Sequence, residues 1–392
     1  MFNLLFWKKK PVNLNILYFM AFFLALAGAL PTYIQSSYLE NFVGLPAVTW
    51  FFITANLISI LTILFFPRFI KKIGNYQATW IMSLLFIFSL AGQGLSTNPY
   101  LIFVFFILMS VAANLIWINM DIFVEKSSNN STTGKTRTIY FTIINLAWII
   151  SPTISASLIS LDNYSTVFLA AAILTTPFLL VLSLYAKKLK SKIYYKKTTI
   201  GKTLLKMHQN PDLSGIFWLS TLLNIFFNAA TVFIPIYLNK VIGFSWIELG
   251  LMFSIMLIPF IVLEIPAGII ADKYLGEKEM LYFGYLIIII SLCLFSTSTT
   301  NNFWFWASLL FFSRIGASLL EAMRETYFFK KVGASDVDKI NIFKASIPFG
   351  YLLGSLISLT VLVFLPINYI FIITALITCS AFPFLATIKD TK

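Results

Sequence analysis

The charged side chains between Arg314 and Lys331 are the residues of this chain best suited to chemistry. Only 11% of the 392 residues are charged. The stretch RIGASLLEAMRETYFFKK nevertheless contains two of the four arginines, and Arg314 follows the apolar run FWFWASLLFF. A guanidinium can pair with a carboxylate or a phosphate, and a glutamate such as Glu321 can take up a proton. The stretch therefore favours binding of an anionic group or proton coupling.

A related set of polar residues lies about 200 residues earlier in the chain. Asn114 and Asp121 correspond there to Arg314 and Glu321. A separation of seven residues is nearly two helical turns, so the two members of each pair share one face of a helix. Each pair therefore requires a helix to position it.

These helices are predicted to cross a membrane. Hydrophobic residues make up 59% of the chain, whereas soluble proteins are about half apolar and about a quarter charged. Apolar runs long enough to span a bilayer recur along the sequence. We predict an all-α integral membrane protein with twelve transmembrane helices, at residues 14–36, 46–66, 76–95, 99–122, 137–160, 163–186, 213–236, 246–271, 279–298, 302–326, 340–364 and 367–388.

The net charge of +13 is explained by topology rather than by nucleic-acid binding. Lys240 is predicted in an outer loop and Arg314 within the membrane, while the other basic residues fall at the inner side or its margin. Such a distribution is typical of cytoplasmic loops. We expect a multi-pass protein in the lipid bilayer of the cytoplasmic membrane, with both termini in the cytoplasm and no nucleic-acid partner.

The chain contains an internal repeat. YLENFVG at residues 38–44 resembles YLNKVIG at residues 237–243, and each follows an apolar run that contains a proline. Agreement between several such segments predicts two pseudo-symmetric six-helix bundles. The expected units are an N-terminal bundle, a Lys-rich cytosolic linker and a C-terminal bundle, at residues 1–186, 187–212 and 213–392.

These features resemble the major facilitator superfamily over nearly the full chain. The best local motif, EIPAGIIADKYLGEK from Glu264 onward, is similar to the family's Gly-x-x-x-Asp-basic loop, with one extra residue before Gly276. The resemblance implies that Glu264, Gly268, Asp272 and Gly276 belong to a latch between the bundles, in which Gly268 lets two helices approach closely. In the first-half copy, Ile70 stands where the acid is expected.

The resemblance also implies a network of charges at the inner face. Such a network would break and re-form as the two bundles rock against each other. The residues assigned to it are Asp121, Glu125, Arg137, Arg324 and Glu325.

In the superfamily the first helix of each three-helix unit lines a central cavity. The polar residues on those spans are the candidates for a substrate or coupling cavity: Arg314, Asn114, Glu321, Asn224, Asn228 and Gln35. Arg314 lies roughly 17 Å into its span, near the midplane, where a charge costs ~3 kcal/mol or more and needs a partner. It would contact either an anionic solute or a coupling group, or it would be a structural arginine fixed by Glu321, Glu264 or Asn114.

We expect a secondary transporter that moves a small solute by alternating access and is coupled to protons. Export of an amphipathic or aromatic compound is the first hypothesis, because the cavity helices carry many aromatic residues. Residues 147–156 also bear a fainter likeness to a drug-exporter pattern, with every glycine replaced by Ala or Ser. The alternatives are proton-coupled or facilitated uptake of a nutrient and, from another class, a non-transporting receptor or a lipid-moving scaffold.

Nothing in the sequence indicates catalysis. The segments 134–136 and 201–203 end like phosphate-binding loops but lack the glycine five residues earlier. No His, Cys or carboxylate cluster suggests a metal, and Cys293 and Cys379 have no redox spacing. We therefore expect no enzyme activity, no cofactor, no metal and a monomeric protein.

Overall fold

The computed structural model describes residues 13–127, 133–159, 163–185, 189, 200–332 and 336–389. Within these residues, 12 helical stretches are long and apolar enough to cross a membrane. The predicted all-α fold with twelve transmembrane helices is therefore confirmed, and the protein is a multi-pass membrane protein.

Several spans consist of more than one helix. In chain order the helices are α1 (Leu14–Thr32), α2 (Gln35–Val43), α3 (Leu45–Ile73), α4 (Asn75–Leu95), α5 (Pro99–Ser127), α6 (Thr133–Leu158), α7 (Ser165–Leu184), α9 (Ile200–Gln209), α10 (Pro211–Asn228), η1 (Ala229–Phe233), α11 (Ile234–Ile236), η2 (Tyr237–Ile242), α12 (Trp246–Val262), α13 (Glu264–Lys273), α14 (Glu277–Thr297), α15 (Phe303–Lys331), α16 (Val337–Phe364), α17 (Tyr369–Thr378) and α18 (Ala381–Thr387).

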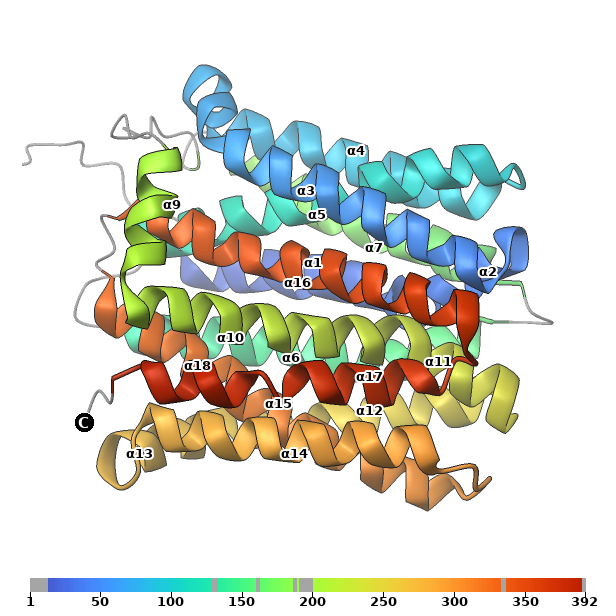
Figure 1. The fold of residues 1–392 in the computed structure, drawn as a ribbon. Coiled ribbons are helices and arrows are strands. Elements are labelled where there is room, and N and C mark those ends of the chain that lie inside the picture. Colours follow the sequence, from blue (N-terminus) through green and yellow to red (C-terminus); the bar gives the residue numbers. More distant parts are fainter. Residues whose placement is uncertain are drawn as a thin grey trace, which may run out of the picture.

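The long helices run side by side, and the short helix α9 lies across their ends at the left of Figure 1. We call this side the α9 end, and the C-terminus lies there as well. Helices α2 and α11 lie at the opposite side, the α2 end (Figure 1). The first part of the predicted linker, residues 187–212, lies largely outside the described residues, and its second half, from Ile200 onward, forms α9 and the start of α10.

Two extensive contacts join the first six spans to the last six. Helix α3 packs on α16, and α6 packs on α12. Within the second half, α10 packs on both α16 and α15. Residues of α10 and α15 that point inward therefore lie close to the junction between the halves.

The first span is not the continuous helix expected over residues 14–36. It breaks after Thr32: Pro31 has no N–H to donate to the carbonyl of Ala27, and the next carbonyl, that of Gly28, accepts from the Thr32 hydroxyl at 2.8 Å. Helix α2 begins only at Gln35. Tyr33 and Ile34 form the break between the two helices.

The seventh span is also irregular, and it is longer than the predicted 213–236. Two π-helical segments, η1 and η2, flank the short helix α11 that contains Pro235. Proline cannot donate to the carbonyl four residues earlier, and a wider turn accommodates that loss. The irregular part of the span extends to Ile242 at the α2 end.

Corresponding turns in the two halves both need glycine. Gly74 precedes α4 with φ of 88°, and Gly276 precedes α14 with φ of 105°. Residues with a Cβ rarely adopt this region of φ. The role of Gly276 in the motif is thus to make the turn between α13 and α14.

Candidate functional site

Arg314 is a fully buried cation surrounded by aromatic rings. Only 1% of the residue is exposed. Its guanidinium carbon lies 5.3 Å from the ring centre of Phe226 and 6.0 Å from that of Phe227, both on α10. Nη1 donates to Ser313 Oγ at 3.3 Å, and Nη2 has no hydrogen-bond acceptor of ordinary geometry among the described residues. The rings stabilise the charge through cation–π contact but leave donor capacity unused.

Two tyrosines from other helices face Arg314. Tyr33, in the break between α1 and α2, comes within reach of a side-chain hydrogen bond to the guanidinium. Tyr351 of α16 also interacts with it electrostatically. Residues from both halves of the chain thus converge on one buried charge.

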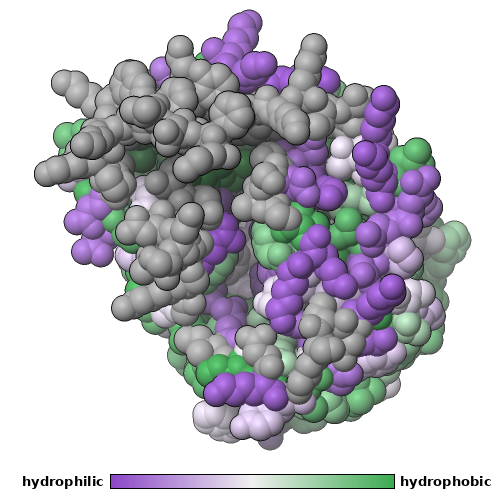
Figure 2. Space-filling view, turned by 90° about the vertical axis from the view of Figure 1, so that its left-hand side faces the viewer, coloured by the Kyte–Doolittle hydropathy of each residue, from purple (hydrophilic) through white to green (hydrophobic). Residues whose placement is uncertain are grey.

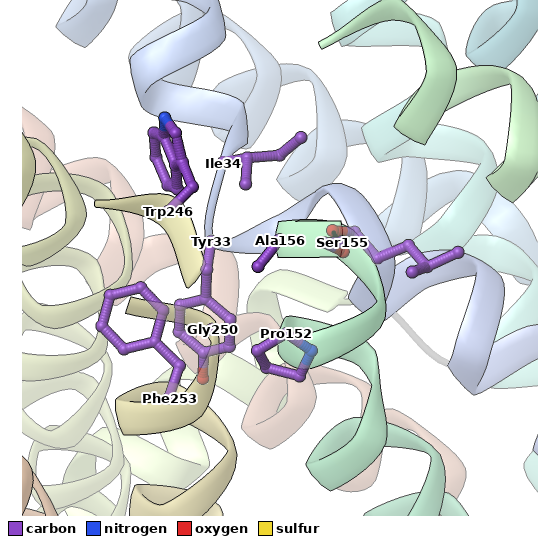
Figure 3. A pocket seen from close by; sticks show the side chains of 9 residues that line it. Tyr33, Ile34, Pro152, Ser155, Ala156, Trp246, Gly250 and Phe253 are labelled. Atoms are coloured by element: carbon purple, nitrogen blue, oxygen red, sulfur yellow. Dashed lines mark hydrogen bonds between the residues drawn. The ribbon is translucent and has the colours of Figure 1, made fainter. Parts of the chain in front are cut away.

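Tyr33 also lines a small pocket on the α2 side of Arg314. The rings of Tyr33 and Phe253 lie next to each other there, with centres 5.1 Å apart (Figure 3). Trp246 covers the pocket, and its ring centre is 5.6 Å from that of Tyr164. Aromatic packing therefore closes the junction of the halves toward the α2 end.

Small residues bring α6 and α12 together beside this pocket. A Cβ built on Gly250 would lie 2.5 Å from the Cβ of Ala156 and 2.8 Å from the carbonyl oxygen of Pro152. The hydroxyls of Thr153 and Ser254 are 2.8 Å apart across the same contact. The segment that resembles a drug-exporter pattern thus forms close packing between the two halves.

A charge pair at the α2 end also joins the halves. Glu40 on α2 interacts electrostatically with Lys240 on η2. Burial raises the pKa of the Glu40 carboxyl, and the opposite charge of Lys240 partly lowers it again. This pair lies on the two irregular spans described above.

The acids on α15 pair with basic residues other than Arg314. Arg324 Nη2 lies 3.7 Å from Glu321 Oε1 and 3.8 Å from Glu325 Oε1. Lys344 Nζ on α16 is 3.1 Å from the same oxygen of Glu325. The alternative in which Glu321 fixes Arg314 is therefore not what the structure shows.

The side chains of Glu321, Glu325 and Lys344 are partly exposed. The side chain of Glu321 is 40% exposed, although it lies two turns from the buried Arg314 on one helix. Figure 2 looks onto the α9 end, where hydrophilic residues surround a hollow. The junction of the halves is thus more open toward the α9 end than toward the α2 end.

Glu264 lies between helices of the two halves. It interacts electrostatically with Glu321, and the amide of Asn145 on α6 is within hydrogen-bonding reach of it. The expected close approach at Gly268 is not seen among the described residues, where a Cβ built on Gly268 would meet nothing within 4 Å. Gly268 lies on a part of α13 that packs less closely than the family motif implies.

The other inner-face candidates gather around Lys344. The guanidinium of Arg137 on α6 lies 5.6 Å from the ring centre of Phe329 on α15. Glu325 interacts electrostatically with Arg137, and Lys344 interacts with Asp121. The side chains of Glu125 and Asp272 lie outside the described residues.

Gln35 and Asn114 bond to neighbours within the first six spans. Gln35 Nε2 donates to Gln93 Oε1 at 2.7 Å. Asn114 Nδ2 donates to Ser59 Oγ at 3.2 Å and to the carbonyl of Ser110 at 3.0 Å. The structure describes no hydrogen bond from either amide to Arg314, so the alternative in which Asn114 fixes Arg314 is not observed either.

Asn224 and Asn228 face α16. A Cβ built on Gly350 would lie only 2.4 Å from the Cβ of Asn224. Asn228 Nδ2 donates to Ser355 Oγ at 3.0 Å. In this conformation both amides belong to the packing of α10 on α16.

Lys344 and Tyr351 contribute to this site although no sequence motif indicates them. Both lie on the eleventh span, which is not one of the helices that the family pattern assigns to the cavity. A lysine inside a predicted apolar span was nevertheless a usable signal, because such a charge needs a partner.

Comparison with known proteins identifies the family. A structure of a mutant form of the nucleoside transporter NupG matches with a TM-score of 0.76 and 16% identity, over 96% of this chain and 100% of that one. A POT family transporter in complex with 5-aminolevulinic acid matches with a TM-score of 0.74 and 14% identity, over 96% of both chains. At these identities the likeness shows the fold alone, and no curated protein matches the sequence. The family model described as Major Facilitator Superfamily matches residues 12–337 and 247–392, so this chain belongs to that superfamily of secondary transporters.

Proposed function

We propose that this transporter moves a small solute by alternating access through a site centred on Arg314. The observation that carries the proposal is the convergence of Tyr33, Arg314 and Tyr351 at the junction of the two halves. A buried intramembrane charge that faces protein rather than lipid is the usual mark of a solute or ion pathway.

The α9 end is assigned to the cytoplasm. Lys71 and Lys72 end α3 there, and Lys330 and Lys331 end α15. Basic residues of this kind stay on the cytoplasmic side of a membrane. Both termini would then be cytoplasmic, in the cytoplasmic membrane, and the described conformation would face inward.

Proton coupling is proposed to act through Glu321. Its partly exposed side chain lies between the hollow of the α9 end and the buried Arg314, next to Glu264. A carboxyl group that changes its exposure as the halves rock would bind and release a proton. Glu264, which contacts α6, fits a latch between the halves better than a proton site.

Export of an amphipathic or aromatic compound fits the rings around Arg314. Uptake of a nutrient is the second candidate, and the likeness in fold to a nucleoside transporter and to a POT family transporter favours it. Both candidates use the same site and differ in the direction of net flux.

A solute panel in proteoliposomes tests the proposal. The purified protein is assayed with and without a pH gradient, and Arg314→Ala is compared with wild type. We expect Arg314→Ala to lower flux by about 10- to 100-fold, because the free energy of a lost charge-assisted hydrogen bond corresponds to a change in rate of about that size. Arg68→Ala, which removes an exposed arginine, is the matched control. Equal flux in wild type and Arg314→Ala would exclude this site.

A further inference from the structure

We infer that the transported solute carries an anionic oxygen group, such as a carboxylate or phosphate, which displaces Tyr33 from Arg314. This inference rests on the proposed function and names the class of solute. The observations behind it are the partners of the nearby acids, the geometry of the guanidinium, and the position of Tyr33 in the fold.

No described ion pair includes Arg314, because the acids on the same helix pair with other basic residues. Glu321 pairs with Arg324, and Glu325 pairs with both Arg324 and Lys344. A guanidinium that is 1% exposed and lacks a carboxylate partner is an unfavourable arrangement for a protein that only needs to fold. An anionic solute would supply the missing charge.

The geometry around the guanidinium leaves part of its in-plane donor capacity unused, because Ser313 accepts only from Nη1. Phe226 and Phe227 contact it as cation–π partners, which do not accept its N–H bonds. Among the described residues, Nη2 has no acceptor of ordinary hydrogen-bond geometry. The planar fork of an arginine matches the paired oxygens of a carboxylate or phosphate, and the aromatic walls suit an apolar or aromatic remainder of the solute.

Tyr33 occupies the position of a weaker acceptor. A neutral phenol accepts a hydrogen bond without neutralising the charge, so an anionic group competes with it effectively. Tyr33 is also the residue at which α1 breaks, and its ring packs on Phe253 in the pocket near the α2 end (Figure 3). Displacing Tyr33 would therefore loosen the contact that closes the α2 end, and anion binding would be linked to opening there.

Matched pairs of acids and amides test this inference directly. The full chain in lipid nanodiscs is titrated with benzoate and benzamide, phenylacetate and phenylacetamide, and indole-3-acetate and indole-3-acetamide, and Kd is measured by microscale thermophoresis. Each pair has one shape and differs in charge. We expect each acid to bind about tenfold or more tightly than its amide, as a charge-assisted hydrogen bond predicts.

Two variants separate the roles of the two residues. Arg314→Gln should abolish the preference for acids, whereas Arg68→Gln should preserve it. Tyr33→Phe removes the competing hydroxyl, so it should lower the Kd of the acids severalfold and leave the amides unchanged. Because Tyr33→Phe keeps the ring, this arm remains decisive even when Arg314→Gln fails to fold.

The inference is overturned when acids and amides bind equally, when neither binds in any pair, or when Arg314→Gln keeps the acid preference. Its failure is distinguishable from failure of the proposed function. Flux of neutral solutes alone would refute the anionic class but leave a transporter, whereas the absence of flux for every solute would refute transport itself.

Discussion

Arg314 lies among aromatic rings, and the acids on the same helix neutralise other cations. Glu321 is 3.7 Å from Arg324, so it connects the inner-face charges rather than the buried arginine. One helix thus carries a buried cation and, two turns closer to the α9 end, a partly exposed acid. This division supports separate sites for the solute and for the coupling proton.

The role of Glu321 in coupling is tested by Glu321→Gln. The amide cannot ionise, so accumulation driven by a pH gradient should fall to the level seen without a gradient. Solute exchange without a gradient should continue, because Arg314 is unchanged. Glu248→Gln, which makes the same substitution at the capping residue of α12 and away from the α15 charges, is the control. Persistent pH-driven accumulation in Glu321→Gln would contradict this assignment.

At the scale of single residues, the sequence predicted positions better than partners. Hydropathy and the helical period correctly predicted that Arg314 and Glu321 lie on the same membrane-spanning helix. They could not show that Tyr33 reaches Arg314, since the two are almost 300 residues apart and meet only through packing. Nor could they show that Asn224 and Asn228 face α16, because periodicity identifies a shared face but not the helix it contacts.

The elements differ in how well local sequence determines them. Spans without a proline after their first residue, such as α5 and α15, begin and end within about five residues of the expected limits. Departures occur at Pro31 and Pro235, where lost hydrogen bonds are replaced by a break and by π-helical turns. A proline in a predicted span indicates such irregularity, but tertiary contacts decide whether it becomes a kink, a break or a widened turn.

Close packing of α10 on α16 is tested by Gly350→Ala. The added methyl would lie 2.4 Å from the Cβ of Asn224 and 2.6 Å from the carbonyl oxygen of Thr221. Overpacking of this kind costs about 1–3 kcal/mol, so the melting temperature should fall. Gly268→Ala is the matched control, because its added methyl meets nothing within 4 Å and should leave stability equal or slightly higher. Equal melting temperatures for the two variants, measured by dye-based thermal unfolding, would contradict the described contact.

On the scale of the whole molecule, the junction between the two halves differs in composition between the α2 end and the α9 end. Toward the α2 end, Gly250 allows α12 to touch α6, and aromatic rings fill the remaining space. Toward the α9 end, the interface is charged and partly exposed around Glu321 and Lys344. Such asymmetry is what alternating access requires, because charged contacts can separate and re-form while close packing seals the opposite side.

We propose that transport requires α6 and α12 to separate at the α2 end. Thr153→Cys with Ser254→Cys places two thiols where the hydroxyls are 2.8 Å apart, after Cys293 and Cys379 have been changed to Ser. The decisive measurement is solute flux in proteoliposomes before and after reduction, with cross-linking quantified by thiol labelling. We predict that the oxidised double variant loses flux and regains it on reduction, while each single-cysteine variant is unaffected. Full flux through a fully cross-linked protein would contradict alternating access at this junction.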